Sequence, residues 1–123
     1  MAESDPKLRE SISTAFNAAA VRNFQLMFSF DYAGGIPEGS SWKDKATVIQ
    51  LINEYKGRST YLRHKGKPIV STFEGPTNAP DWKDIKAQTG IVFLPSYSSL
   101  GAQAAMKTEV PDGLFSWAGW PWG

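Results

Sequence analysis

Two kinds of apolar repeat alternate along this chain, and their alternation constrains the fold more than any other feature. Apolar side chains at helical spacing predict helices at 8–19, 48–55, 80–90 and 99–106. Between them lie four stretches of strand character, at 24–30, 68–73, 91–94 and 114–117. Successive strands are far enough apart for a crossover helix, as a parallel sheet requires. The sequence therefore predicts one α/β domain of about four parallel βα units.

Residues that begin and end helices stand at the boundaries of these stretches. Asp5 and Pro6 form a favourable helix start, because Asp accepts free backbone N–H groups and Pro lacks only a donor that the first turn does not use. Ser41 and Asp44 have the spacing of a capping box, and Gly90 is expected to end the third helix. These local signals support the alternating pattern.

Charge and cysteine content exclude several classes of protein. Thirteen Lys and Arg residues balance 12 Asp and Glu, and this near-neutral charge gives no reason to expect a nucleic-acid or membrane partner. The absence of cysteine excludes disulfides and thiolate metal sites. The polar start lacks the apolar stretch of a secretory signal, and no apolar run approaches the roughly 20 residues that span a bilayer. The chain as written is expected to be soluble and cytoplasmic.

Two acidic residues directly follow predicted strands. Asp31 shares a strand face with Ser29, and Glu74 shares one with Thr72, so each strand presents a hydroxyl and then a carboxylate at its carboxyl end. Ligands of parallel βα folds meet these strand ends. In neighbouring barrel strands the two carboxylates would converge, at a separation that fits both classes of glycosidase. The alternative is that both carboxylates accept backbone N–H groups at turns or helix starts.

The last predicted strand leads into three tryptophans within six residues, Trp117, Trp120 and Trp122. Gly119 and Pro121 break regular structure between them, so the three indoles cannot all belong to a core. Indole faces pack against the apolar faces of sugar rings, and the indole N–H offers a hydrogen bond. Saccharide binding and hydrophobic closure of a sheet end both fit this pattern.

A basic cluster precedes the second predicted strand and consists of Arg58, Arg63, His64, Lys65 and Lys67. Cations are favourable near a helix carboxyl end, so we interpret the cluster as a solvated helix end and turn. His64 is the only histidine and has no second metal ligand at a useful spacing. No phosphate-binding, Ser-His-Asp or HExxH motif occurs. We therefore expect neither a metal nor a cofactor.

Three longer strings resemble glycoside hydrolase family 71, the fungal α-1,3-glucanases or mutanases: FSFDYAG at 28–34, GKPIVSTFEGP at 66–76 and DGLFSWAGWPWG at 112–123. Two shorter stretches, at 81–90 and 98–102, fit as well. The resemblance covers nearly the whole chain, with its motifs in the family order. It implies a (β/α)8 TIM barrel and inverting, endo-acting hydrolysis of α-1,3-glucan, in a family whose members are typically secreted or associated with the fungal cell wall.

The chain departs from the family pattern where catalysis is concerned. The resemblance places the catalytic carboxylates in an Asp-x-x-Glu motif of a later region, and no Asp-x-x-Glu occurs in these 123 residues. Where the family typically reads Pro-Asp-Trp, this chain has Pro95-Ser96-Tyr97, without the strand-end carboxylate. We therefore interpret residues 1–123 as an incomplete catalytic barrel segment, a partial barrel that is inactive alone.

By the same resemblance, the cleft contains six substrate-binding residues: Asp31, Tyr32, Glu74, Trp117, Trp120 and Trp122. Asp31 and Glu74 are the best candidates for a catalytic contribution, as supporting carboxylates rather than as the acid/base pair. The expected partner is the polysaccharide α-1,3-glucan. A non-catalytic α-glucan-binding module and a gene fragment without function are the alternatives. Because a partial barrel exposes unpaired sheet edges, self-association is also predicted.

Overall fold

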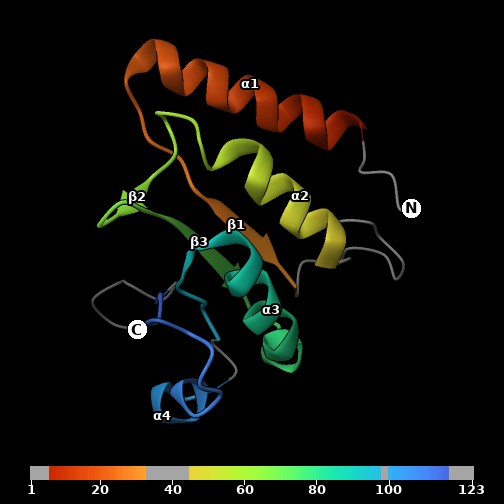
Figure 1. The fold of residues 1–123 in the computed structure, drawn as a ribbon, viewed down its shortest axis with the longest axis vertical. Coiled ribbons are helices and arrows are strands. Elements are labelled where there is room, and N and C mark those ends of the chain that lie inside the picture. Colours follow the sequence, from red (N-terminus) through yellow and green to blue (C-terminus); the bar gives the residue numbers. More distant parts are fainter. Residues whose placement is uncertain (1–5, 33–44, 98–99, 117–123) are drawn as a thin grey trace, which may run out of the picture.

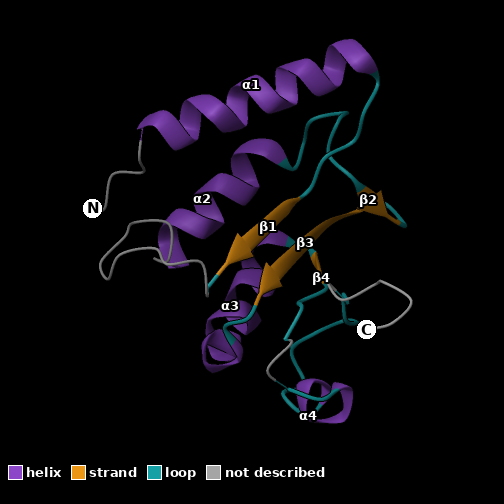
Figure 2. Ribbon diagram, turned by 180° about the vertical axis from the view of Figure 1, so that it is seen from behind, coloured by secondary structure: helices purple, strands orange, loops and turns teal. Residues whose placement is uncertain are grey.

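The computed structural model describes residues 6–32, 45–97 and 100–116, which form helices packed on a small sheet (Figure 1). The elements in chain order are α1 (Pro6–Arg22), β1 (Phe28–Asp31), α2 (Lys45–Tyr55), β2 (Arg63–His64), β3 (Lys67–Phe73), the 3-10 helix η2 (Pro76–Asn78), α3 (Ala79–Thr89), β4 (Val92–Phe93) and α4 (Ala102–Met106). In the view from behind, β1, β3 and β4 lie in front of α3 (Figure 2). None of the helices among the described residues combines the length and apolar character needed to cross a bilayer.

β3 is the central strand of the sheet. It pairs in parallel with β1 from Phe28↔Val70 to Asp31↔Phe73, and in parallel with β4 through Val70↔Phe93. β1, β3 and β4, which alternate with helices along the chain, are therefore neighbours in the sheet. Because they are parallel, their carboxyl ends lie at the same edge. The predicted parallel arrangement is confirmed for these three strands, while the (β/α)8 barrel stays a prediction, because the described residues form an open sheet.

The basic segment before β3 forms a hairpin that the sequence did not predict. β2 pairs antiparallel with β3 through Arg63↔Pro68 and His64↔Lys67. The two residues between these strands, Lys65 and Gly66, have φ angles of 51° and 80°. Positive φ at both central residues is the signature of a two-residue type I′ turn. The interpretation of this segment as a helix end and turn was therefore wrong for β2.

The core is an aromatic layer between the sheet and α1, α2 and α3. Phe16 of α1 packs on Phe28 with ring centroids 5.8 Å apart. Trp82 of α3, fully buried, stacks on Phe93 with centroids 4.5 Å apart and planes inclined by 4°. Phe30 lies beside the same indole, at 5.9 Å. Alternate strand residues thus face the helices, as the period of two requires.

The predicted helices are confirmed, whereas two predicted strands differ. The first strand is shorter than 24–30: Phe24 is 67% exposed, and Leu26 forms only an isolated bridge with Tyr61. Residues 114–116, the described part of the last predicted strand, form no strand. There the Asp112 side chain accepts the Phe93 N–H at 2.8 Å, so a side chain occupies the donor that a neighbouring strand would use.

Candidate functional site

The carboxyl ends of β1 and β3 lie side by side and carry three of the predicted site residues, Asp31, Tyr32 and Glu74. Asp31 pairs with Phe73, and the Tyr32 N–H donates to the Phe73 carbonyl at 2.9 Å. Glu74 is the next residue along. β1 and β3 are parallel neighbours about 4.8 Å apart, so the two acidic residues lie close together at the same edge of the sheet. The expectation that they share the same end of the sheet is confirmed.

The expectation of a common hydroxyl face is wrong. Ser29 pairs with Ser71, whereas Thr72 pairs with Phe30 on the side covered by helices. Residues paired across a parallel ladder point to the same side of the sheet, so Ser29 and Thr72 lie on opposite faces. Counting parity along each strand could not reveal this, because a shift of one residue in register exchanges the two faces.

Glu74 ends β3 in a left-handed backbone conformation. Its φ is 58°, and the φ of Gly75 is 81°. A residue with a Cβ pays on the order of 1 kcal/mol in this region. The Glu74 N–H donates to the Ser96 carbonyl at 2.8 Å, which ties the turn to the segment after β4. Strand alternation therefore ends at Phe73 and does not determine the direction of the Glu74 carboxylate.

Tyr32 packs on this turn and is held by Trp82. A Cβ placed at Gly75 would lie 2.7 Å from Tyr32 Cγ, so any larger residue would collide with the tyrosine. The Tyr32 hydroxyl accepts a hydrogen bond from Trp82 Nε1 at 3.0 Å. Burial raises the pKa of Tyr32, the Trp82 hydrogen bond opposes this, and the Asp81 charge adds to it. The phenol is therefore neutral at physiological pH.

Two buried hydroxyls near the same edge, Thr72 Oγ1 and the Tyr97 hydroxyl, have no hydrogen-bond partner within the described ranges. Burial raises the pKa of Tyr97 to about 12, and the proximity of Tyr32 contributes. Buried polar groups are nearly always paired with protein or with ordered water. Both hydroxyls therefore have the capacity to bind an ordered water, but Thr72, 1% exposed beneath the helices, is closed to a larger ligand. Sequence reasoning noted Tyr97 only as a departure from the family pattern, and it gave Thr72 no role in binding.

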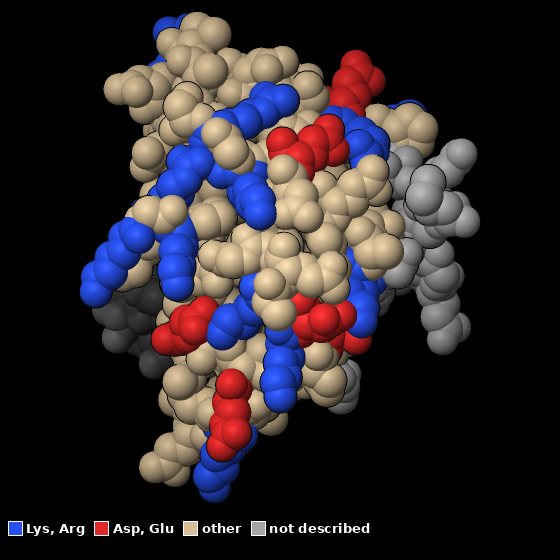
Figure 3. Space-filling model, viewed as in Figure 1, with Lys and Arg blue, Asp and Glu red and all other residues tan. Residues whose placement is uncertain are grey.

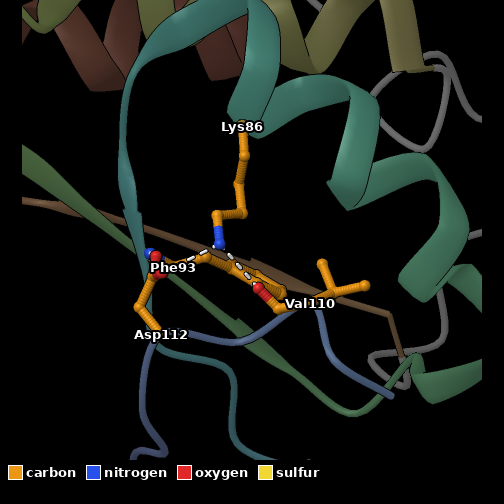
Figure 4. Close-up of polar contacts among 4 residues, drawn as sticks. All are labelled: Lys86, Phe93, Val110 and Asp112. Carbon is orange, nitrogen blue, oxygen red and sulfur yellow. Dashed lines mark hydrogen bonds and ion pairs between the residues drawn. The ribbon is translucent and has the colours of Figure 1, made fainter.

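A second polar cluster fastens the segment after α4 to α3 and β4 (Figure 4). Lys86 Nζ donates to the Val110 carbonyl at 2.7 Å and lies 2.9 Å from Asp112 Oδ1. Asp112 Oδ2 accepts the Phe93 N–H. Burial acts to raise the pKa of Asp112, but the Phe93 N–H and the Lys86 ammonium outweigh it, and the pKa lies below its ordinary value. No spacing pattern links these residues, so the sequence did not predict the cluster.

The basic cluster before β3 is partly structural. The Arg58 guanidinium lies 4.6 Å from the centre of the Tyr55 ring. Arg63 donates to the carbonyls of Tyr61, Lys56 and Arg58, at and beyond the carboxyl end of α2. Although the Arg63 backbone belongs to β2, its guanidinium lies at the helix end, where the sequence predicted cations. Elsewhere on the face seen in Figure 3, basic and acidic side chains are interspersed.

The three predicted sugar-contacting tryptophans, Trp117, Trp120 and Trp122, lie outside the described residues and stay predictions. Within residues 6–32, 45–97 and 100–116, no group of three or more His, Asp or Glu side chains is arranged to hold a metal ion. The site that the structure does define is thus the carboxyl edge of β1 and β3, with Asp31, Glu74, the hydroxyls of Tyr32 and Tyr97 and the buried Trp82 indole.

Comparison with known proteins matches the entire chain to one family. The model of glycosyl hydrolase family 71 covers residues 1–123. A glucan endo-1,3-alpha-glucosidase of Schizosaccharomyces pombe is 32% identical over 127 residues, which cover 91% of this chain and 28% of the relative. A mutanase of Penicillium rubens is 28% identical over 114 residues, covering 89% of this chain and 24% of the relative. The chain thus spans about a quarter of the length of these relatives. No solved structure matches it.

Proposed function

Because this chain belongs to glycosyl hydrolase family 71, as its motifs predicted, we propose that it forms a saccharide-binding part of an endo-α-1,3-glucanase acting on α-1,3-glucan. The observation that carries the proposal is the family match over residues 1–123, supported by relatives named as a glucan endo-1,3-alpha-glucosidase and a mutanase. The cytoplasmic location expected from the sequence stays a prediction.

We further propose that β1, β3 and β4 are consecutive strands of a (β/α)8 barrel. In support, the three strands are parallel and adjacent in chain order. The side chains of α2 and α3 pack on one face of the sheet through Tyr55 on Phe28 and Trp82 on Phe93. In such barrels the substrate lies at the carboxyl ends of the strands. Asp31 and Glu74 would then stand on the substrate side.

The proposed chemical role of the two carboxylates is substrate contact. Glycoside hydrolysis needs one carboxyl to protonate the leaving oxygen and another to activate water or to attack the sugar. The 123 residues contain no Asp-x-x-Glu, the motif that the family resemblance assigns to this pair. We therefore assign Asp31 and Glu74 to binding the sugar hydroxyls beside the reacting bond, and we expect the isolated chain to bind glucan without cleaving it.

Retention of the purified chain on insoluble α-1,3-glucan tests the proposal. Trp120→Ala should reduce retention several-fold, since an indole face is worth about 1 kcal/mol or more in such contacts. Phe24→Ala removes an aromatic ring that is exposed and lies before β1, away from its carboxyl end, and is the matched control. Retention that is equal on β-1,3-glucan, or unchanged in Trp120→Ala, would contradict the assignment.

Two alternatives also fit the sequence. A non-catalytic α-glucan-binding module fits the tryptophan-rich end and the missing motif, and like our proposal it predicts binding without cleavage by the isolated chain. Release of reducing sugar by the wild-type chain, lost in Glu74→Gln, would contradict both and would assign Glu74 a catalytic role. The second alternative, a gene fragment without function, would leave a sheet edge unpaired and apolar surface uncovered, and both favour self-association. The structure contains such a surface beside β1, a hollow of about 290 Å³ lined by Leu8, Ile12, Phe28 and their neighbours.

A further inference from the structure

We propose that Tyr32 is a positioning residue that sets the place of Glu74 at the carboxyl edge of the sheet, through its contact with Gly75 and its hydrogen bond with Trp82. The inference rests on the proposed function, because it concerns the same saccharide site. It assigns a task to two residues, Gly75 and Trp82, that neither the sequence motifs nor the comparisons assign. Tyr32 was predicted to bind substrate; in this proposal it acts indirectly, by positioning Glu74.

The turn that carries Glu74 is strained and therefore needs support. Glu74 and Gly75 both have positive φ, 58° and 81°. Conformations of this kind persist in non-glycine residues only where the surroundings fix them, and they concentrate at functional sites. On one side, the Glu74 N–H donates to the Ser96 carbonyl at 2.8 Å. This bond holds the backbone of the turn against the segment after β4.

The other side of the turn is held by the Tyr32 ring. Tyr32 Cβ and the ring atoms Cγ and Cδ2 would lie 2.7 to 2.8 Å from a Cβ at Gly75, so the Tyr32 side chain rests directly on the glycine. Tyr32 itself is fixed at its backbone, because its N–H donates to the Phe73 carbonyl. The turn therefore fits only with glycine at position 75 and with the ring in its present orientation.

Trp82 connects Tyr32 to α3 and so completes the contacts around the turn. Its indole N–H donates to the Tyr32 hydroxyl at 3.0 Å, and stacking on Phe93 holds the indole in place. The chain from Gly75 runs through η2 into α3, beginning with the Asn78 N–H on the Gly75 carbonyl at 2.9 Å. Tyr32 is thus held from the sheet and from α3 at once. Removing the Tyr32 side chain removes both its contact with Gly75 and its hydrogen bond with Trp82.

Variants of the 123-residue chain test the proposal with two independent readouts. The first is the three-bond HN–Hα coupling and the Cα and Cβ shifts of Glu74 and Gly75, which report backbone conformation without any ligand. The second is the dissociation constant for an α-1,3-linked glucose tetrasaccharide. Tyr32→Ala should move the Glu74 signals toward extended values and weaken binding about tenfold, the scale of a lost hydrogen bond to a charged group. Tyr32→Phe, which keeps the ring, should have a smaller effect on both, and Tyr55→Phe should change neither.

A double-mutant cycle separates positioning from general destabilisation. If Tyr32 acts through Glu74, Tyr32→Ala adds nothing to the loss caused by Glu74→Ala. Additive losses, or Glu74 signals unchanged in Tyr32→Ala, would overturn the proposal. If Tyr32→Ala does not fold, Tyr32→Phe and Trp82→Phe decide by the same signals. Failure of the wild-type chain to bind the saccharide would contradict the proposed function alone, since the Glu74 signals still decide the positioning.

Discussion

The hydroxyl of Tyr61 donates a hydrogen bond of 2.8 Å to the carbonyl oxygen of Ile69. The Tyr61 hydroxyl oxygen in turn accepts the N–H of Phe28 at 3.1 Å. One fully buried phenol thereby pairs with backbone groups of both β1 and β3, on the aromatic side of the sheet. Since unpaired buried backbone groups are costly, this tyrosine joins the two strands whose far ends carry Asp31 and Glu74.

Tyr61→Phe should lower the free energy of unfolding by about 1–3 kcal/mol, because it leaves a buried donor and a buried acceptor unpaired. Urea denaturation followed by tryptophan fluorescence measures this. Tyr55→Phe is the control: Tyr55 is another buried tyrosine of the same core, and its hydroxyl bonds to none of the described residues. Equal losses in the two variants would show that ring packing, and not the hydrogen bonds, accounts for the effect.

Alkaline pH should destabilise the fold between about pH 10 and pH 12. Burial raises the pKa of Tyr61 from 10.0 to about 12, and that of Tyr97 likewise. In this interval the unfolded chain loses phenolic protons that the folded chain retains, so stability is complete below pH 10 and falls as the pH rises. Melting temperatures across the interval should fall less steeply in Tyr61→Phe. An unchanged slope would contradict this assignment.

Acid should weaken the Lys86–Asp112 cluster. The pKa of Asp112 lies below its ordinary value of 3.8, so its contribution is present above that pH and is lost as the pH falls through the lower, folded-state pKa. The loss of stability as the pH falls from about 5 through 3.8 and below should be smaller in Asp112→Asn and in Lys86→Met than in the wild-type chain. Identical acid dependence in all three chains would show that the titration of Asp112 does not contribute to acid destabilisation.

Arg63→Lys should destabilise the junction between α2 and β2 by about 1–3 kcal/mol, although the charge is retained. The guanidinium donates to three backbone carbonyls at once, and a lysine ammonium cannot reproduce that planar geometry. Arg9→Lys, at an ion pair with Glu54 whose side chain is 42% exposed, is the matched control and should cost less than about 1 kcal/mol. Thermal unfolding compares the two; a larger loss in Arg9→Lys would refute the assignment.

The apolar hollow beside β1 should mediate association between copies of this chain. Leu8 is 38% exposed at its rim, so Leu8→Lys places a charge where a second copy would bury apolar surface. Sedimentation velocity at increasing concentration should show the wild-type chain forming larger species and Leu8→Lys remaining smaller. Gln103→Lys adds the same charge on α4 and should behave as the wild type. A wild-type chain that is monomeric throughout would contradict self-association.

Much of the fold was predictable because the relevant interactions are local. The helical spacing that predicted 48–55 lies in α2, and Gly90 ends α3 in a left-handed conformation, as its lack of a Cβ suggests. The three strings at 28–34, 66–76 and 112–123 together predicted the family, which the match over the whole chain then confirmed. The hairpin at Lys65 and Gly66 was missed although a glycine stood at the turn, because the basic residues suggested a solvated segment.

The sequence by itself determined the helices and the alternation with the parallel strands β1, β3 and β4, because spacings of 3.6 and 2 residues follow from the backbone of each segment alone. Only the tertiary structure decided that Ser29 faces Ser71, that Asp112 replaces a strand beside Phe93, and that Glu74 turns left-handed under Tyr32. Each of these depends on how segments distant in the chain meet, and the energy of packing them together selects a register that no local pattern specifies.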